Sequence, residues 1–152
     1  GIRDSSVTGV QTCALPIYTL VHRVRMPIRW GDMDAMGHVN NTIYFRYLEQ
    51  ARIEWFEAMG CPPAFSGIGP VIISAHCTFL KQLRYPGDIT VTTSIGDFGR
   101  SSFHTRHEIR RVDEPETLMA EGGSKVVWVD QRIEKSVALP DEMRDLLIKQ
   151  RV

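Results

Sequence analysis

The sequence predicts an α+β fold in which one antiparallel sheet of five strands wraps around a single long helix. Two observations lead to this prediction. A strand-like segment, 20–30, is followed by one segment with strong helical periodicity, 42–59. After the helix the hydrophobic period changes to two and stays so through four further segments. A helix flanked by an unbroken run of strands is typical of an α+β domain.

The first strand has one apolar and one basic face. Its alternation is the pattern of a strand with one covered side. Pro27 interrupts the pattern and indicates an edge strand or a bulge, since proline cannot donate a hydrogen bond to a neighbouring strand. One face carries His22, Val24, Met26, Ile28 and Trp30, and the other carries Arg23, Arg25 and Arg29.

The predicted helix, 42–59, has a wide apolar surface. At about 100° per residue its main apolar stripe lies opposite charged and amide side chains. Phe45 and Phe56 widen that stripe, and Ile53 falls among the charges. We therefore expect the sheet to enclose the helix, which ends before Gly60 because glycine stops helices. The main stripe contains Tyr44, Tyr47, Leu48, Ala51, Trp55, Ala58 and Met59.

The four later strands are separated by turn residues. Their Gly- and Pro-containing turns lie at 85–88, 96–99 and 113–115. The pair Gly122-Gly123 predicts a bulge in the last strand, and a short helix is expected from Leu139. The open edges of such a sheet favour pairing with a second subunit. The predicted strands are 71–83, 89–95, 102–112 and 118–130.

Composition bounds the function. A chain of 152 residues fits one domain, and 18 basic against 18 acidic residues argue against general nucleic-acid binding. No apolar run is long enough to span a bilayer, and no metal-ligand or phosphate-loop motif occurs. We interpret Cys13, Cys61 and Cys77 as reduced thiols of a cytoplasmic protein.

The first residues differ from the rest. Residues 1–17 show no sustained period and resemble the translation of a sequencing adapter. We expect them to be a non-native leader and the folded domain to comprise 18–152.

The residues that could carry chemistry lie in one turn, 30–41. It contains two carboxylates, two glycines, a histidine and two asparagines, immediately before the helix. The free N–H groups and positive dipole end of a helix N-terminus could stabilise an oxyanion beside an acid, base or nucleophile. The alternative is that these are only turn and cap residues, which use the same amino acids.

The string from Gly31 to Asn41, Gly-Asp-Met-Asp-Ala-Met-Gly-His-Val-Asn-Asn, with Tyr44 and Tyr47, resembles the signature of hotdog-fold acyl-CoA thioesterases of the 4-hydroxybenzoyl-CoA thioesterase type. The turns at 85–88 and 99–102 also resemble the corresponding turns of this family. The resemblance implies a hotdog fold and hydrolysis of acyl-CoA thioesters. It implies no cofactor other than coenzyme A as part of the substrate, and a homodimer or tetramer with the active site at the subunit interface.

The resemblance also implies roles for individual residues. Asp34, the second aspartate, would act as nucleophile or as general base for water. Backbone amides from Gly37 to Asn41 and the Tyr44 hydroxyl would stabilise the oxyanion. His38 would mainly order the turn, and Asn41 stands where some relatives have a histidine. The coenzyme A phosphates and pantetheine arm would contact Arg84, Arg100, Ser101 and Ser102.

Other residues have structural interpretations. We expect His76 to be a buried structural histidine and Cys77 to be core. We expect one strand face to be exposed to solvent or to lie at a subunit interface; it carries His104, Arg106, Glu108 and Arg110. The sequence does not specify which acyl group is bound. We expect its binding site to have an apolar lining formed by Met33, Met36, Tyr47 and Phe65.

Three alternatives to acyl-CoA hydrolysis keep the same fold. The protein could be a non-catalytic acyl-CoA-binding module, an acyl carrier-protein thioesterase or a hydroxyacyl dehydratase. Dehydration needs a histidine and an acid in the pocket, which the Asp34 turn fits poorly.

Overall fold

The structure is a computed structural model that describes residues 17–61 and 67–150. Most of the expected leader, with Cys13, and the expected lining residue Phe65 lie outside the described residues.

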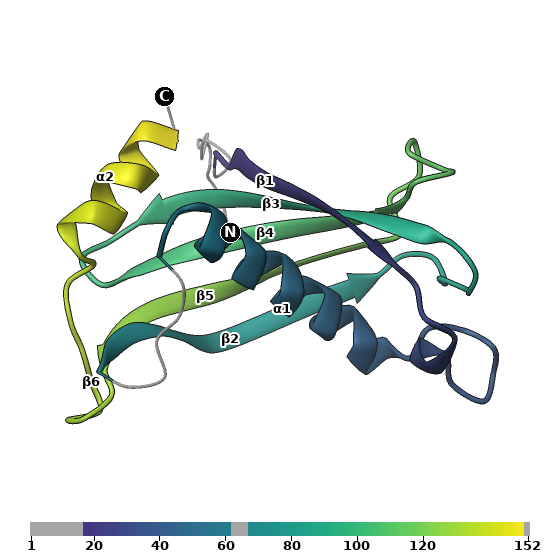
Figure 1. Ribbon diagram of the computed structural model, residues 1–152, viewed down its shortest axis with the longest axis horizontal. Coiled ribbons are helices and arrows are strands. Elements are labelled where there is room, and N and C mark those ends of the chain that lie inside the picture. The colour runs from purple at the N-terminus through teal and green to yellow at the C-terminus, as the bar shows by residue number, and fades with distance from the viewer. Residues whose placement is uncertain (1–16, 62–66, 151–152) are drawn as a thin grey trace, which may run out of the picture.

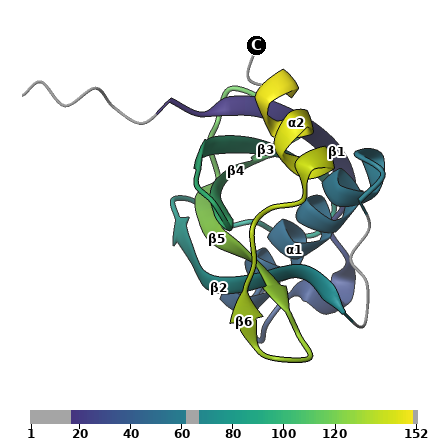
Figure 2. The same cartoon turned by 90° about the vertical axis from the view of Figure 1, so that its left-hand side faces the viewer.

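One antiparallel sheet curves around the long helix α1 (Figures 1 and 2). Its strand order is β1-β3-β4-β5-β2, and the two-residue β6 pairs with the end of β5. This confirms the predicted α+β fold, with five long strands and one short addition. The elements in chain order are β1 (Thr19–Pro27), the 3-10 turn η1 (Trp30–Asp32), α1 (Asn41–Ala58), β2 (Ile68–Phe79), β3 (Asp88–Phe98), β4 (Ser102–Arg111), β5 (Ala120–Asp130), β6 (Lys135–Ser136) and α2 (Asp141–Gln150).

Helix α1 buries its wide apolar stripe against the concave face of the sheet. Its N-terminus is capped by Asn40, whose Oδ1 accepts a hydrogen bond from the Thr42 N–H at 2.9 Å. Gly60 follows its end with a φ of 78°, a conformation that glycine adopts without strain. The buried residues of α1 are Tyr44, Tyr47, Leu48, Ala51, Arg52, Trp55 and Phe56.

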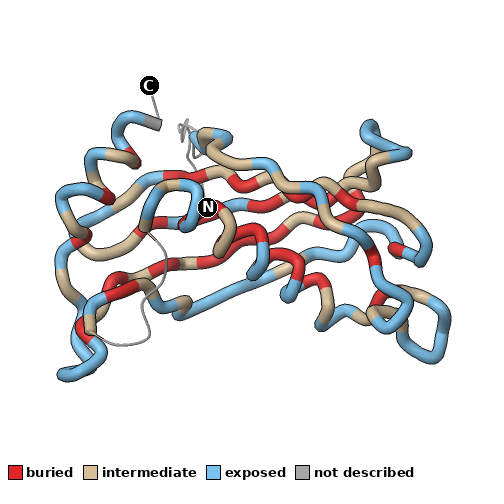
Figure 3. The backbone as a smooth tube through the Cα atoms, in the orientation of Figure 1, coloured by how far each residue is buried: buried red, intermediate tan, exposed pale blue. Residues whose placement is uncertain are grey.

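The core divides along α1 into two clusters. Figure 3 shows buried positions in red along both the helix and the strands. The first surrounds Tyr44, Tyr47 and Leu48 near the helix N-terminus. The second surrounds Trp55 and Phe56 near the C-terminus, where α2 covers the end of the sheet. The second cluster also contains Ile95, Phe103, Val126, Trp128, Leu139, Met143 and Leu147.

The predicted bulge at Gly122-Gly123 is wrong. The register of β5 runs without a shift through both glycines on either side, and the irregularity lies in β2 between Ile72 and Ser74. A Cβ on Gly122 would collide with the His76 carbonyl oxygen and lie 3.0 Å from Leu48 Cδ1. This glycine therefore lets the helix approach the sheet closely.

Four strand ends also differ from prediction by three residues or more. Strand β2 begins at Ile68 and not at 71, and β3 runs through most of the predicted turn at 96–99 to end at Phe98. The strand β1 stops at Pro27, and Trp30 enters η1 with its side chain 74% exposed. Strand β2 stops at Phe79 because the next two amides, those of Leu80 and Lys81, both donate to the Met119 carbonyl oxygen. The chain from 80 to 87 is consequently free to turn toward the start of α1.

The buried histidine is His107, and the prediction for His76 is wrong. His76 lies exposed on the outer face of the edge strand β2. His107 is fully buried, with Nδ1 3.1 Å from Thr93 Oγ1 and Nε2 3.2 Å from Thr105 Oγ1. Burial, with a smaller effect of the nearby Arg52, lowers the pKa of His107 to about 3. Its imidazole is therefore neutral near pH 7.

Candidate active site

The turn between β1 and α1 is a small closed loop. A backbone bridge joins Met33 to Val39. Within it the Asp34 N–H donates to the His38 carbonyl oxygen at 2.8 Å, and the Gly37 N–H donates to the Asp34 carbonyl oxygen at 3.1 Å. Gly37 has a φ of 82°, so the turn requires glycine there. These bonds hold Asp34 at the tip of a fixed loop.

Only one oxygen of the Asp34 carboxylate is engaged. Oδ1 accepts the Met36 N–H at 2.9 Å and the His38 N–H at 3.5 Å. Among the described residues nothing donates to Oδ2, and the side chain is exposed. The carboxylate is thus oriented by the turn and keeps one oxygen free for a reacting group.

Asp34 lies at the rim of an open hollow of about 550 Å³. Its apolar lining is exposed: Met36 is 79%, Phe79 42% and Leu80 49% accessible. The hollow therefore combines a free carboxylate oxygen with an apolar surface. Its lining consists of Asp34, Met36, His38, Val39, Asn41, Tyr44, Phe79, Leu80, Lys81 and Gln82.

The start of α1 contributes a free backbone donor. Asn40 caps the helix, and its Oδ1 also accepts the Thr42 hydroxyl at 2.8 Å. Within the described chain the Asn41 N–H has no acceptor, and Asn41 lines the hollow. A helix N-terminal N–H favours negative charge in front of it.

Tyr44 supports the wall of the hollow. Its hydroxyl accepts the Leu83 N–H at 3.1 Å and donates to the Lys81 carbonyl oxygen at 3.5 Å. Burial is the main cause that raises the pKa of Tyr44. The neutral phenol connects α1 to the segment after β2, and the long bond to Lys81 is its weaker contact.

The predicted coenzyme A contacts separate into two groups. Arg84 lies beside the Asp34 turn, because its Nη2 is 2.9 Å from His38 Nε2. Arg100, Ser101 and Ser102 lie at the opposite end of the sheet, in the β3–β4 turn near α2 (Figure 1). There the Leu139 N–H donates to the Arg100 carbonyl oxygen at 2.7 Å. One chain alone does not bring the two groups together.

Asp32, the first aspartate, has a supporting contact that the sequence did not reveal. The Tyr47 hydroxyl donates to Asp32 Oδ2 at 2.7 Å, and the Arg29 N–H donates to the same oxygen at 2.9 Å. Burial, followed by this hydrogen bond, raises the pKa of Tyr47. Both residues line a separate hollow of about 350 Å³ beside β1, so Tyr47 does not line the Asp34 hollow as expected.

Sequence reasoning missed four lining residues, which are Phe79, Leu80, Lys81 and Gln82. No motif marks them, and they reach the hollow only because β2 ends early. Of the other expected lining, Met36 is present, whereas Met33 belongs to the backbone bridge.

Cys77 packs against the first core cluster, as predicted, and burial raises its pKa to about 11.

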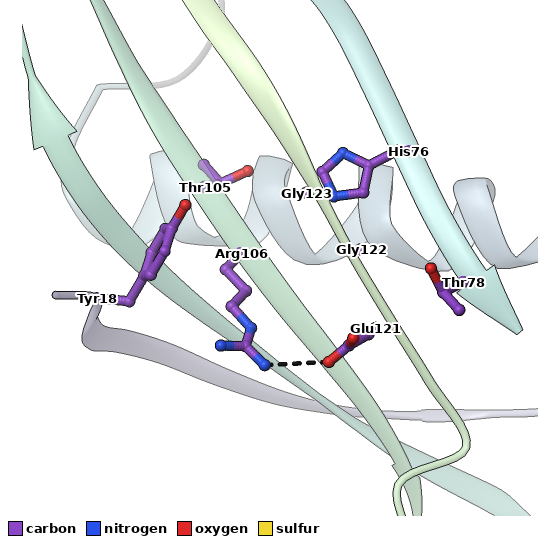
Figure 4. Close-up of a pocket in the computed structure, with 8 residues that line it drawn as sticks. All are labelled: Tyr18, His76, Thr78, Thr105, Arg106, Glu121, Gly122 and Gly123. Carbon is purple, nitrogen blue, oxygen red and sulfur yellow. Dashed lines mark hydrogen bonds and ion pairs between the residues drawn. The ribbon is translucent and has the colours of Figure 1, made fainter. Parts of the chain in front are cut away.

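A third hollow lies on the outer face of the sheet (Figure 4). Arg106 there pairs with Glu121 at 3.0 Å and with Glu108 at 3.3 Å, so the predicted polar strand face is confirmed. The exposed His76 flanks the space above Gly123. The cation is already neutralised by two carboxylates, and this face lies away from the Asp34 turn.

A single antiparallel sheet wrapped around one long helix is the fold of the hotdog class of thioesterases. The family model described as "Thioesterase-like superfamily" matches residues 28–147. The chain belongs to this superfamily and is a thioester hydrolase.

Individual relatives agree with this assignment. The 4-hydroxybenzoyl-CoA thioesterase of Pseudomonas sp. is 33% identical over 90 residues, which are 55% of this chain and 64% of that protein. A structure described as "a putative Thioesterase from Pseudomonas aeruginosa" is 39% identical, with 84% of this chain and 98% of that one covered and a TM-score of 0.81. A "putative acyl-CoA thioesterase from Xanthomonas campestris" is 35% identical over 74% of this chain and 95% of that one, with a TM-score of 0.68.

Two features are absent from residues 17–61 and 67–150. No helix in these ranges is long and apolar enough to cross a membrane. They also contain no group of three or more His, Cys, Asp or Glu side chains arranged to hold a metal ion.

Proposed function

We propose that this protein hydrolyses acyl-CoA thioesters to a free acid and coenzyme A, with Asp34 as the catalytic carboxylate. The observation that carries the proposal is the state of Asp34. The turn fixes Oδ1, Oδ2 is free, and both lie at the rim of a hollow with exposed apolar side chains. Coenzyme A enters only as part of the substrate, and no other cofactor is proposed.

Two routes are compatible with this carboxylate. As a nucleophile, Oδ2 attacks the thioester carbonyl carbon, the C–S bond breaks, and the thiolate leaves with the electron pair. Water then hydrolyses the resulting anhydride to the acid and regenerates Asp34. As a general base, Asp34 takes a proton from water, whose oxygen attacks the same carbon directly. The C–S bond then breaks, the thiolate leaves with the electron pair, and the protonated Asp34 returns its proton to the thiolate. In both routes negative charge develops on the carbonyl oxygen, and the Asn41 N–H is the proposed donor.

A homodimer is proposed because β2 has one unpaired edge. It is the last strand in the sheet order, its pattern is mostly exposed, and it carries exposed Val71 and Ile73. Pairing there would cover this edge. The contacts proposed for Arg100, Ser101 and Ser102 then require the partner's β3–β4 turn, since this turn lies at the far end within one chain. Free Cys61 and Cys77 fit the proposed cytoplasmic location.

The test is thiol release from a panel of acyl-CoA and acyl carrier-protein thioesters. We expect Asp34→Ala to lower kcat/KM by about a hundredfold or more on the best acyl-CoA. Asp145→Asn, on the exposed surface of α2, is the matched control and should leave it unchanged. Undiminished turnover by Asp34→Ala would refute the proposed role. Binding of acyl-CoA without thiol release by the unaltered protein would favour a non-catalytic module.

A further inference from the structure

A largely buried arginine at the end of β4 binds the backbone next to the candidate active site. Arg111 follows Ile109 in the inward-facing row of β4, and its side chain is only 13% exposed. Its Nη1 donates to the Arg84 carbonyl oxygen at 2.8 Å, and Nη2 donates to the Pro86 carbonyl oxygen at 2.9 Å. Two carbonyl groups of one connecting segment are therefore held by one rigid guanidinium.

Asp113 orients that guanidinium from the other side. Asp113 Oδ1 accepts a hydrogen bond from Arg111 Nε at 2.9 Å, and Asp113 Oδ2 accepts one from Arg111 Nη2 at 3.2 Å. The hydrogen bond to Asp113 raises the pKa of Arg111. Such a bidentate pair fixes the plane of the guanidinium as well as its position.

Gly87 makes room for this arrangement. A Cβ at this position would collide with Arg111 Nη2 and lie 2.7 Å from its Cζ. Gly87 has a φ of 146°, which residues with a side chain rarely adopt. The backbone conformation and the space for Arg111 thus both depend on glycine.

The segment that Arg111 holds, 80–87, forms part of the candidate active site; we call it the post-β2 segment. Its Leu83 carbonyl oxygen accepts the Val39 N–H at 2.8 Å, and its Leu83 N–H donates to the Tyr44 hydroxyl. Lys81 lines the Asp34 hollow. One segment therefore bonds to Arg111 on one side and to both the Asp34 turn and α1 on the other.

We propose that Arg111 is a positioning residue for the Asp34 site, which acts by fixing the post-β2 segment against the Asp34 turn. This inference rests on the proposed hydrolysis for its catalytic readout. Arg111 touches no substrate in this account. Its loss displaces Val39 and Tyr44, and with them the turn and helix start that face the thioester.

The chain contains a matched control for an arginine–aspartate pair. Arg132 also donates Nε and Nη2 to an aspartate two residues away, Asp130, at 3.1 and 2.8 Å. It follows β5 near the opposite end of the sheet, is 72% exposed, and holds no part of the Asp34 turn. Arg111→Lys and Arg132→Lys both keep the charge and remove the planar fork of an arginine–aspartate pair, and only Arg111 is connected to the site.

The experiment compares kcat, KM and amide hydrogen exchange in these two variants. Arg111→Lys should lower kcat about tenfold or more, with a smaller change in KM, because small displacements of reacting groups are costly. It should also speed exchange of the Val39 and Leu83 amides. Arg132→Lys should change neither the kinetic constants nor the exchange of these two amides. The milder Asp113→Asn should shift kcat and exchange in the same direction as Arg111→Lys, which keeps the test open if the lysine variant does not fold.

Failure of the positioning role of Arg111 can be distinguished from failure of the proposed hydrolysis. If Arg111→Lys keeps both the kcat and the exchange rates of the Arg132→Lys control, Arg111 has no positioning role. If exchange rises while kcat per folded molecule stays unchanged, the role is structural only and the proposal is wrong. If the unaltered protein hydrolyses no thioester, the proposed function fails, and exchange at Val39 and Leu83 still decides whether Arg111 holds the segment.

Discussion

The two ends of α1 differ in the contacts that surround their apolar clusters. At the C-terminal end, aromatic rings pack against one another: Trp55 meets Phe103 edge-to-face with centroids 5.8 Å apart, and Phe56 meets Trp128 at 6.5 Å. At the N-terminal end, hydrogen bonds orient a turn that leaves Asp34 exposed. Both ends bury an apolar cluster, but only the N-terminal end adds polar contacts that keep a carboxylate accessible. Changes at the C-terminal end should alter stability, and changes at the N-terminal end should alter turnover.

The largest effect on stability is expected at Phe103. Its side chain is fully buried beneath Trp55, so Phe103→Ala should lower the free energy of unfolding by about 3–5 kcal/mol. Chemical denaturation measures this loss. Turnover per folded molecule should stay near that of the unaltered protein. A selective fall in kcat with the fold intact would contradict the assignment of stability to this end of α1 and of turnover to the other.

An effect that is small near neutral pH and grows as the pH falls is expected from His107, which lies in the sheet between the two ends. Its pKa is lowered on folding, so below about pH 6.5 the unfolded chain binds a proton that the folded protein excludes. Stability should therefore fall as the pH drops from about 6.5 toward 3, by up to about 1.4 kcal/mol per pH unit. Urea unfolding at several pH values measures the slope, and His107→Gln should remove this contribution. An unchanged slope in the variant would contradict the burial of a neutral imidazole.

The smallest stability effect is expected at the helix cap. Asn40→Ala removes the acceptor for the Thr42 N–H and should lower the free energy of unfolding by about 1 kcal/mol. Because the cap sets the start of α1, thiol release should also fall severalfold. Asn40→Asp keeps the acceptor and serves as the control. A stability loss with unaltered turnover in Asn40→Ala would show that the cap does not influence the site.

The sequence predicted the features that depend on local pattern. The helix was expected at 42–59 and runs from Asn41 to Ala58. The turn around Asp34 was expected before the helix because glycine, aspartate and asparagine there determine the backbone locally. The strands were expected from alternation, although β2 ends early where the Leu80 N–H bonds to Met119 in another segment of the same chain.

Features that depend on pairing between strands could not be predicted. His76 and His107 both occupy alternating segments, and only the register shows that the first faces outward and the second faces α1. Gly122 looks like a bulge locally, whereas its role arises from Leu48 across the core. The contact of Arg111 with the post-β2 segment joins residues far apart in the chain, and no local motif signals it.

The most direct test replaces the Asp34 carboxylate by an isosteric amide. Thiol release and the thermal midpoint would be measured together for Asp34→Asn and for Phe103→Ala. We expect Asp34→Asn to melt close to the unaltered protein and to lose about a hundredfold or more in kcat/KM, with the reverse result for Phe103→Ala. Full thioester cleavage by a stable Asp34→Asn protein would contradict the central claim that this side chain performs the chemistry.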